Sequence, residues 1–412
     1  MKQIFLFILL LNSYLSYAIE VKVIGNKKTS TKKIVELALV HQLKKFDKKE
    51  LELIEQRLLR TGLFVDAKAK FKGKTLYIEI EDRWTLIPIL KFASGGGVTH
   101  TTAGIYEANL FGRIKELGTQ YERLGGTNSG VAWFKDSLFF DSKTGIDLQL
   151  WKVNRLRTKY NQDLSKPTIV NGFLHQRENL LIGINRFIND HLNWSLSLEY
   201  HNDSFSNKLV PDGAKSKNNG QNLPPSTEFF FVGLSSDIGL IKKDRHLQDG
   251  NQFNLKLRHG FSSTHTVKDF TQFDLAWSYF QSLGINTFAQ RIMTGMTNTD
   301  ALQYWNYLGG LDRIRGFADN RFAGRYYFLS NTEYRHSIVN RTNWVLQLST
   351  FFDAVAISEY FRDLGELTAT SAGIGFRVIL PKIYRFVFRF DYAKPLKKSD
   401  DNAISFGVQQ FF

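Results

Sequence analysis

The chain has 412 residues and a formal net charge of +15, with 54 lysines and arginines against 39 acidic residues. Aromatic residues make up 14% of it, yet the mean hydropathy is only −0.25, and beyond the N-terminus no apolar run approaches the roughly 18 residues that a membrane-spanning helix needs. This excludes a helical membrane protein and favours strands with one lipid-facing and one water-facing side. The basic residues are spread along the whole chain, so the charge does not indicate a nucleic-acid partner.

Residues 1–18 are predicted to be a secretory signal peptide. Lys2 precedes an apolar core from Ile4 to Leu11, and Ser16-Tyr17-Ala18 forms a small-residue cleavage site. A single membrane anchor is the alternative, but the apolar run is short for one. We therefore expect an exported mature chain, and the absence of cysteine excludes both disulfides and a lipid anchor at the new N-terminus.

Residues 19–83 differ in pattern from the rest of the chain and predict a small α+β domain of order β-α-α-β-β. After a short strand comes a helix whose buried face carries Ile34 and Ala38. A second helix begins at Asp47, with Glu50 in a capping-box position, and two alternating strands follow. The open edge of such a sheet can accept an extended peptide as an additional strand. On pattern alone, the domain could also be only a spacer.

Residues 84–412 show strand periodicity throughout, and the connections between strands are polar. The predicted strands are Leu86 to Ser94, Thr101 to Asn109, Glu116 to Arg123, Val131 to Phe139, Gly145 to Val153, Gln176 to Phe187, Asn193 to His201, Glu228 to Ile238, Gln252 to His259, Phe270 to Phe280, Ile285 to Met296, Gly324 to His336, Trp344 to Asp353, Ser371 to Leu380, Tyr384 to Tyr392 and Ala403 to Phe412. We therefore expect an all-β transmembrane barrel of about 16 antiparallel strands, an even number as barrel closure favours.

The segment from Leu308 to Phe328 is far longer than a hairpin connection needs and is rich in apolar and aromatic residues, so we expect it to fold against the barrel. Arg315 lies at its middle, and an arginine removed from water needs acidic partners with good geometry. Glu333 and Asp353 fall on the polar faces of the next two strands. We predict that the segment folds into the lumen and that Arg315 contacts both carboxylates.

These features resemble the superfamily of outer-membrane assembly and secretion barrels that includes BamA, TamA and two-partner secretion transporters such as FhaC. Residues 19–83 look like one polypeptide-transport-associated (POTRA) domain. The segments that carry this likeness are Val23-Ile24-Gly25-Asn26, Thr61-Gly62-Leu63-Phe64 and Leu76 to Arg83. The barrel begins like the family's with Glu107-Ala108-Asn109-Leu110-Phe111-Gly112.

The long segment carries the most specific part of the resemblance. Ile314, Arg315, Gly316 and Phe317 resemble the family's inward-folded loop motif, and Glu333 and Asp353 match the acids that the loop arginine contacts in relatives. The terminal Phe412 resembles the C-terminal aromatic residue by which such barrels are recognised for insertion. Three features depart from the family. Val355 replaces a common glycine, there is one POTRA domain rather than several, and the mature N-terminus leaves no room for the plug helix of secretion transporters.

The resemblance implies a non-enzymatic protein of the bacterial outer membrane, with the POTRA domain in the periplasm, that assembles, inserts or translocates proteins. Its partners would be unfolded outer-membrane or secreted polypeptides, outer-membrane lipid and periplasmic accessory proteins. The POTRA edge would hold a partner strand while the seam between the first and last barrel strands opens. The alternatives are a two-partner-type secretion pore for an unfolded passenger and a passive porin-like barrel.

The sequence carries no pattern that indicates catalysis. It has neither a Gly-x-Ser-x-Gly nor a His-Glu-x-x-His motif, and its nine histidines are scattered. We therefore expect no catalytic residues, no metal and no cofactor.

Overall fold

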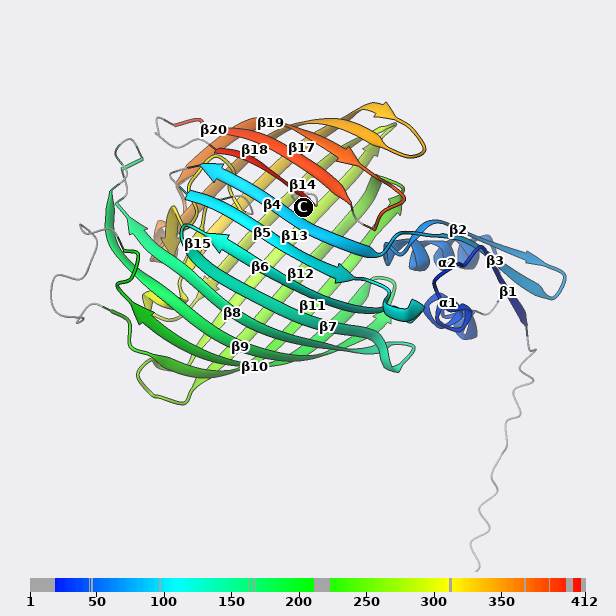
Figure 1. The fold of residues 1–412 in the computed structure, drawn as a ribbon, viewed down its shortest axis with the longest axis horizontal. Coiled ribbons are helices and arrows are strands. Elements are labelled where there is room, and N and C mark those ends of the chain that lie inside the picture. Colours follow the sequence, from blue (N-terminus) through cyan, green and yellow to red (C-terminus); the bar gives the residue numbers. More distant parts are fainter. Residues whose placement is uncertain are drawn as a thin grey trace, which may run out of the picture.

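The computed structural model describes residues 19–408 apart from 44, 46, 96, 97, 162, 165, 167, 211–222, 311, 312, 367, 385 and 398–402. The predicted signal peptide and the terminal Phe412 therefore lie outside the described residues. Figure 1 shows a large barrel with a small domain at one end. Among the described residues, no helix has the length and apolar character needed to cross a membrane.

The N-terminal domain has the β-α-α-β-β order predicted from the sequence, with one additional turn of 3₁₀ helix, η1. Its elements are β1 (Glu20–Ile24), α1 (Thr31–Ala38), η1 (Val40–Gln42), α2 (Lys48–Arg60), β2 (Phe64–Lys72) and β3 (Thr75–Asp82). The sheet order is β1-β3-β2, with β1 parallel and β2 antiparallel to β3.

Local sequence explains where α2 begins and which face it buries. The Asp47 side chain accepts a hydrogen bond from the backbone N–H of Glu50 at 2.9 Å and so caps the first turn. Ile54 and Leu58, four residues apart, are fully buried. They belong to one apolar cluster with Ile34 of α1, and this cluster continues into the barrel through residues such as Tyr106.

Sixteen antiparallel strands form the closed barrel, which confirms the predicted fold class. They are β4 (Leu86–Gly95), β5 (Val98–Glu107), β6 (Lys115–Leu124), β7 (Thr127–Asp141), β8 (Thr144–Tyr160), β9 (Ile169–Asn189), β10 (Leu192–Ser206), β11 (Thr227–Asp244), β12 (Leu247–Ser262), β13 (Phe270–Leu283), β14 (Asn286–Thr297), β17 (Tyr326–Asn340), β18 (Val345–Ser358), β19 (Ala369–Ile379), β20 (Val387–Pro395) and β21 (Ala403–Val408). The last strand, β21, pairs with the first, β4, and this pairing forms the seam.

Side chains alternate between an apolar outside and a polar inside, as the sequence pattern predicts. Leu150 of β8 and Leu180 of β9 are register partners, and both are exposed on the outside. On the inner face, Glu333, Asp353 and Arg377 are completely buried. The barrel wall therefore presents apolar groups outward and charged groups to the lumen.

The two ends of the barrel differ in their connections. At the end that carries the N-terminal domain, here called the domain end, strands are joined by tight turns such as 142–143 and 190–191. At the opposite end, the far end, the connections include the segments 263–269 and 298–325. Figure 1 shows the connection that carries β15 at the far end, away from the N-terminal domain.

Most strand boundaries differ from those predicted by a few residues, and two of the differences bear on the architecture. The strand expected over Gln176 to Phe187 extends over Ile169–Asn189, because the residues before Gln176 contain neighbouring apolar pairs and so do not alternate between apolar and polar. Tyr384 lies outside β20. Its backbone N–H donates to the Trp84 carbonyl at 2.9 Å rather than to a neighbouring barrel strand, and its ring packs edge-on against Tyr106. The segment before β20 thus joins the barrel to the linker that leaves the N-terminal domain.

Candidate functional site: a lumen loop anchored by buried ion pairs

The connection between β14 and β17, residues 298–325, folds back into the barrel. It contains the 3₁₀ turn η4 (Leu302–Tyr304) and a small hairpin of β15 (Asn306–Leu308) and β16 (Phe322–Gly324). Ile314 and Phe317 are buried and pack with Leu329 and Val355 of the wall. These apolar contacts explain why such a long connection is ordered inside the barrel.

Arg315 makes the central polar contact between this loop and the wall. Its Nε and Nη2 donate to Oδ2 and Oδ1 of Asp353 at 2.8 and 2.7 Å, and its backbone N–H donates to the same carboxylate at 3.1 Å. Nη1 donates to Oε1 of Glu333. All three side chains are at most 1% exposed. The structure thus brings together the arginine and both acids that the sequence singled out.

The guanidinium also lies over an aromatic ring. Its Cζ is 3.6 Å from the ring centroid of Phe351, two residues before Asp353 on β18. Gly373 lies opposite Phe351 on β19, and a Cβ at this glycine would be 2.4 Å from the ring. A glycine is therefore needed here for the ring to lie under Arg315.

Gly316 and Val355 complete the packing around the motif. Gly316 has a φ of +90°, a left-handed conformation that glycine adopts without strain. Val355 is fully buried and contributes to the apolar cluster with Ile314 and Phe317. Val355 thus supplies part of the wall surface against which the loop packs.

The ion pairs continue beyond the residues found from the sequence. Arg335 donates to Oε2 of Glu333 at 2.7 Å, and Arg377 lies 3.4 Å from Oε1 of the same acid. Arg377 also pairs with Asp391 at 2.7 Å, as does Arg389 at 3.3 Å. With Arg315, four arginines share three carboxylates, so each of these buried groups has a partner of opposite charge. Alternation alone marks Arg377 and Asp391 as lumen-facing, but only the strand register shows that they meet.

A second part of the loop is anchored on the opposite wall. The Tyr304 hydroxyl donates to Oδ2 of Asp203 at 2.7 Å and lies 2.6 Å from the Thr227 hydroxyl. Asp203 is fully buried and also contacts Arg177 at 2.6 Å and His175 at 2.8 Å. These residues were not identified from the sequence, because Tyr304 and Asp203 are 101 positions apart and nothing local marks the pair.

A third contact joins the loop to β8. Arg157 donates to the Asn320 side chain at 2.6 Å, and its guanidinium lies 4.6 Å from the Tyr307 ring centroid. The Asn320 side chain in turn donates to the Leu156 carbonyl at 3.2 Å. The loop is therefore held by β17 and β18 on one side and by β8, β10 and β11 on the other, so it crosses the lumen. We call residues 298–325 the crossbar loop.

The N-terminal domain is docked on the domain end of the barrel through the segment Glu107 to Gly112. Lys28 pairs with Glu107 at 2.7 Å, and the Asn109 side chain donates to the Thr29 hydroxyl at 2.8 Å. The backbone N–H of Ser30 donates to the Gly112 carbonyl at 2.9 Å. This segment forms the turn between β5 and β6 and supports the domain.

Within the described part of the chain, no group of three histidine or acidic side chains is placed to hold a metal ion.

Comparisons with known proteins agree with this architecture. Residues 109–412 match the model of the Omp85 superfamily domain. The structure of BamA from Haemophilus ducreyi lacking POTRA domains 1–3 is similar with a TM-score of 0.56 and 15% identity, over 95% of this chain and 84% of that one. CdiB from Escherichia coli gives a TM-score of 0.63 and 11% identity, over 94% and 76%. CdiB from Acinetobacter baumannii gives 0.60 and 12%, over 95% and 73%.

No curated protein matches this chain. The solved structures, at these identities, establish the fold, and the family model covers well over half of the sequence. The chain is an outer-membrane β-barrel and belongs to the Omp85 superfamily.

Proposed function

We propose that this protein inserts or assembles client polypeptides at the bacterial outer membrane by opening the seam between β4 and β21. Omp85 proteins handle outer-membrane or secreted polypeptides and are generally non-enzymatic. In this proposal the N-terminal domain acts as a POTRA domain in the periplasm, consistent with the tight turns at the domain end and the long loops at the far end. Unfolded clients, outer-membrane lipid and periplasmic accessory proteins are its partners.

The observation that carries the proposal is the crossbar loop. Contacts with β17–β18, with β10–β11 and with β8 hold it across the lumen, so a polypeptide passing through the barrel would have to break buried ion pairs. Among the described residues, five residue pairs join the two strands of the seam, fewer than join any other neighbouring strands of the barrel. In lipid, an opened seam has unsatisfied backbone groups, and pairing them with a client strand is favourable without an external energy source.

The N-terminal sheet offers a matching capture site. Among the described residues, β2 pairs with β3 on one side, so its other edge can add a client strand by main-chain hydrogen bonds. The family's loop motif, with Arg315 paired to Glu333 and Asp353, stabilises the wall while the seam opens.

A disulfide across the seam tests the proposal. Lys91 of β4 and Gly407 of β21 are register partners, and a Cβ at Gly407 would lie 3.4 Å from the Lys91 Cβ, close to disulfide geometry. Because the chain has no cysteine, a Lys91→Cys/Gly407→Cys variant can form only this bond. We expect the oxidised variant to lose client assembly and the reduced variant to regain it.

A matched control lies elsewhere in the wall. A Cβ at Gly183 of β9 would also lie 3.4 Å from the Cβ of its partner, Asp147 of β8. The Asp147→Cys/Gly183→Cys variant should therefore form an equivalent bond without touching the seam, and it should stay active. If the oxidised seam variant remains fully active, the seam does not open, and passage of a passenger through the lumen becomes the better account.

A further inference from the structure

At the domain end, the two sides of the seam are joined by a main-chain contact of Trp84, Lys382 and Tyr384, here called the clasp. The Trp84 N–H donates to the Lys382 carbonyl at 3.0 Å, and the Trp84 carbonyl accepts from the Tyr384 N–H at 2.9 Å. Lys382 and Tyr384 lie in the connection between β19 and β20, and Trp84 leads into β4. The clasp therefore closes the barrel at this end through the β19–β20 connection rather than through β21.

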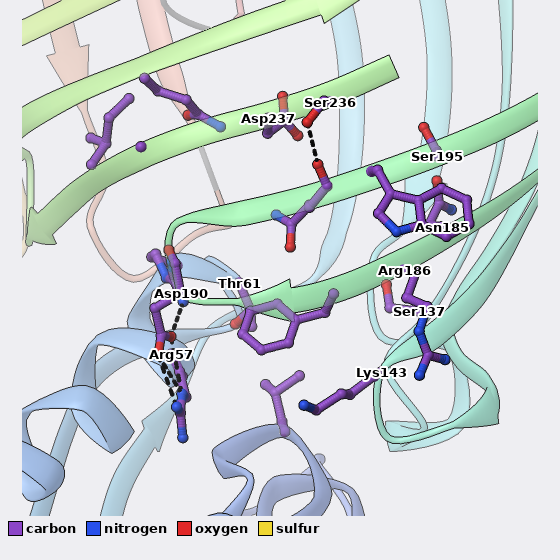
Figure 2. A pocket seen from close by; sticks show the side chains of 18 of the residues that line it. Arg57, Thr61, Ser137, Lys143, Asn185, Arg186, Asp190, Ser195, Ser236 and Asp237 are labelled. Carbon is purple, nitrogen blue, oxygen red and sulfur yellow. Dashed lines mark hydrogen bonds and ion pairs between the residues drawn. The ribbon is translucent and has the colours of Figure 1, made fainter. Parts of the chain in front are cut away.

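An apolar cluster supports the clasp from the inside. Tyr384 is buried together with Ile87 and Ile89 of β4, and all three belong to the cluster that continues from the core of the N-terminal domain. The domain is itself fixed to the barrel, because Arg57 binds Asp190 of the β9–β10 turn at 2.8 Å, as Figure 2 shows. Parting the clasp would therefore expose buried apolar surface to water.

The backbone groups of β4 face β5 and the seam in turn. The Ala108 N–H donates to the Thr85 carbonyl at 3.0 Å, so the hydrogen-bonding groups of Thr85 face β5. The register between β4 and β5 is uninterrupted from Leu86 to Gly95, and in an antiparallel pair every second residue faces the same neighbour. The residues of β4 whose backbone groups face the seam are therefore Leu86, Pro88, Leu90, Phe92 and Ser94.

Next to the clasp, this seam-facing edge of β4 is poorly suited to strand pairing. Pro88 has no N–H to donate, and the Leu86 carbonyl already accepts from the Trp84 indole at 2.6 Å. A strand that lies along β4 at the seam thus meets an interruption of the ladder at Pro88. Continuous pairing is possible from Leu90 to Gly95, and the five described seam pairs lie within this range.

We propose that the seam opens only on the far-end side of the clasp, as a short gate formed by Leu90 to Gly95 of β4 and their β21 partners. Pro88 sets the limit of this gate. When β21 leaves β4, the clasp and its apolar cluster keep the domain end of the barrel closed. The role of the gate in assembly rests on the proposed function, in which a client strand pairs with the exposed edge of β4.

Amide hydrogen exchange of the full-length protein in lipid nanodiscs, resolved to single residues by mass spectrometry, tests the proposal without a client. The amides of Leu90, Phe92 and Ser94 report on the gate. The amides of Trp84 and Tyr384 report on the clasp. After correction for intrinsic exchange rates, the gate amides should exchange about tenfold faster than the clasp amides or more, the factor that one net hydrogen bond makes.

Pro88 variants test what limits the gate. Pro88→Ala supplies a seam-facing N–H and should slow exchange at Leu90 and Phe92 by about tenfold, because the ladder then continues toward the clasp. Pro88→Val should have the same effect, since the two variants share the new N–H but differ in side chain. Pro395→Ala is the matched control, because Pro395 lies in β20, outside the two seam strands, and it should leave these rates unchanged. Thermal unfolding identifies any variant that fails to fold.

Three results would overturn the proposal. The first is clasp amides that exchange as fast as the gate amides, which would mean that the seam opens along its whole length. The second is unchanged exchange at Leu90 and Phe92 in Pro88→Ala. The third is a difference between Pro88→Ala and Pro88→Val, which would assign the effect to the side chain. These rates are measured without a client, whereas an oxidised seam variant that remains active would contradict the proposed function itself.

Discussion

Gly375 lies directly across the β19–β20 ladder from Asp391, and a Cβ at this glycine would be 2.1 Å from the Asp391 carboxylate. The same Cβ would be 2.6 Å from Nη1 of Arg377, which pairs with Asp391 at 2.7 Å. The ion pair therefore occupies the space that a side chain at position 375 would need. Because Arg377 also contacts Glu333, this glycine supports the network that holds the crossbar loop.

The Gly375→Ala variant should consequently destabilise the barrel by about 1 to 3 kcal/mol, since the added methyl group must displace a buried ion pair. Gly365→Ala is the matched control, because a Cβ at Gly365 meets no atom within 4 Å. Urea unfolding in lipid vesicles, followed by fluorescence of the seven tryptophans, measures both. Equal stability of the two variants would show that the barrel wall accommodates the added methyl group at position 375 without loss of stability.

Replacing Arg315 by alanine should destabilise the barrel more than Gly375→Ala does. The change leaves Asp353 and Glu333 buried next to the site without their shared partner, and breaking such a contact costs about 3 to 5 kcal/mol. Arg315→Lys should recover only part of the loss, because an ammonium group cannot reproduce the bidentate contact with Asp353.

The control for this prediction is Arg362→Ala, which removes an exposed arginine paired with Asp363 at 3.6 Å and should change stability by less than about 0.5 kcal/mol. Two properties of each variant are measured: the heat stability of the barrel, followed by gel electrophoresis, and the assembly of client proteins. If Arg315→Ala matches the wild type in both, Arg315 has no structural role in the loop.

Sequence patterns predicted the strands and the face on which each side chain lies, but not which distant residues meet. Period-two alternation gave the sixteen strands and assigned Glu333 and Asp353 to the lumen face, which made them candidates to pair with Arg315. Alternation carries no information on which lumen residues face each other across distant strands. The Tyr304–Asp203 and Arg57–Asp190 contacts join residues 101 and 133 positions apart, and only the closed barrel and the docked domain bring them together.

The second anchor of the loop gives a separate prediction. Tyr304→Phe removes the hydrogen bond to Asp203 and the contact with Thr227, while Asp203 keeps Arg177 and His175. The free energy of unfolding should fall by about 1 to 2 kcal/mol. Because one side of the crossbar is then less firmly held, we expect more frequent openings in planar-bilayer conductance recordings. The exposed Tyr360 provides the control as Tyr360→Phe, and identical recordings for the two variants would argue against the anchor.

Docking of the N-terminal domain should depend on pH through Asp190, which lies in the β9–β10 turn. Burial raises the pKa of this carboxyl, but the guanidiniums of Arg57 and Arg60 outweigh burial and hold the pKa below its ordinary value of 3.8. A carboxyl whose pKa is lowered in the docked state stabilises that state fully above about pH 3.8 and loses this effect as the pH falls through the lowered value. The domain should therefore remain docked at neutral pH and loosen only in strong acid.

The docking of the domain can be measured with spin labels on cysteines introduced at Lys72 of β2 and Leu283 of β13, as the distribution of distances between the two labels. The chain has no other cysteine that would take a label. Asp190→Asn should broaden the distribution already at neutral pH and remove its acid dependence, because the amide lacks the charge that both arginines bind. Asp363→Asn, at an exposed acid of the far end, should behave as the wild type. A narrow distribution for Asp190→Asn at neutral pH would mean that the Glu107–Gly112 contacts alone hold the domain.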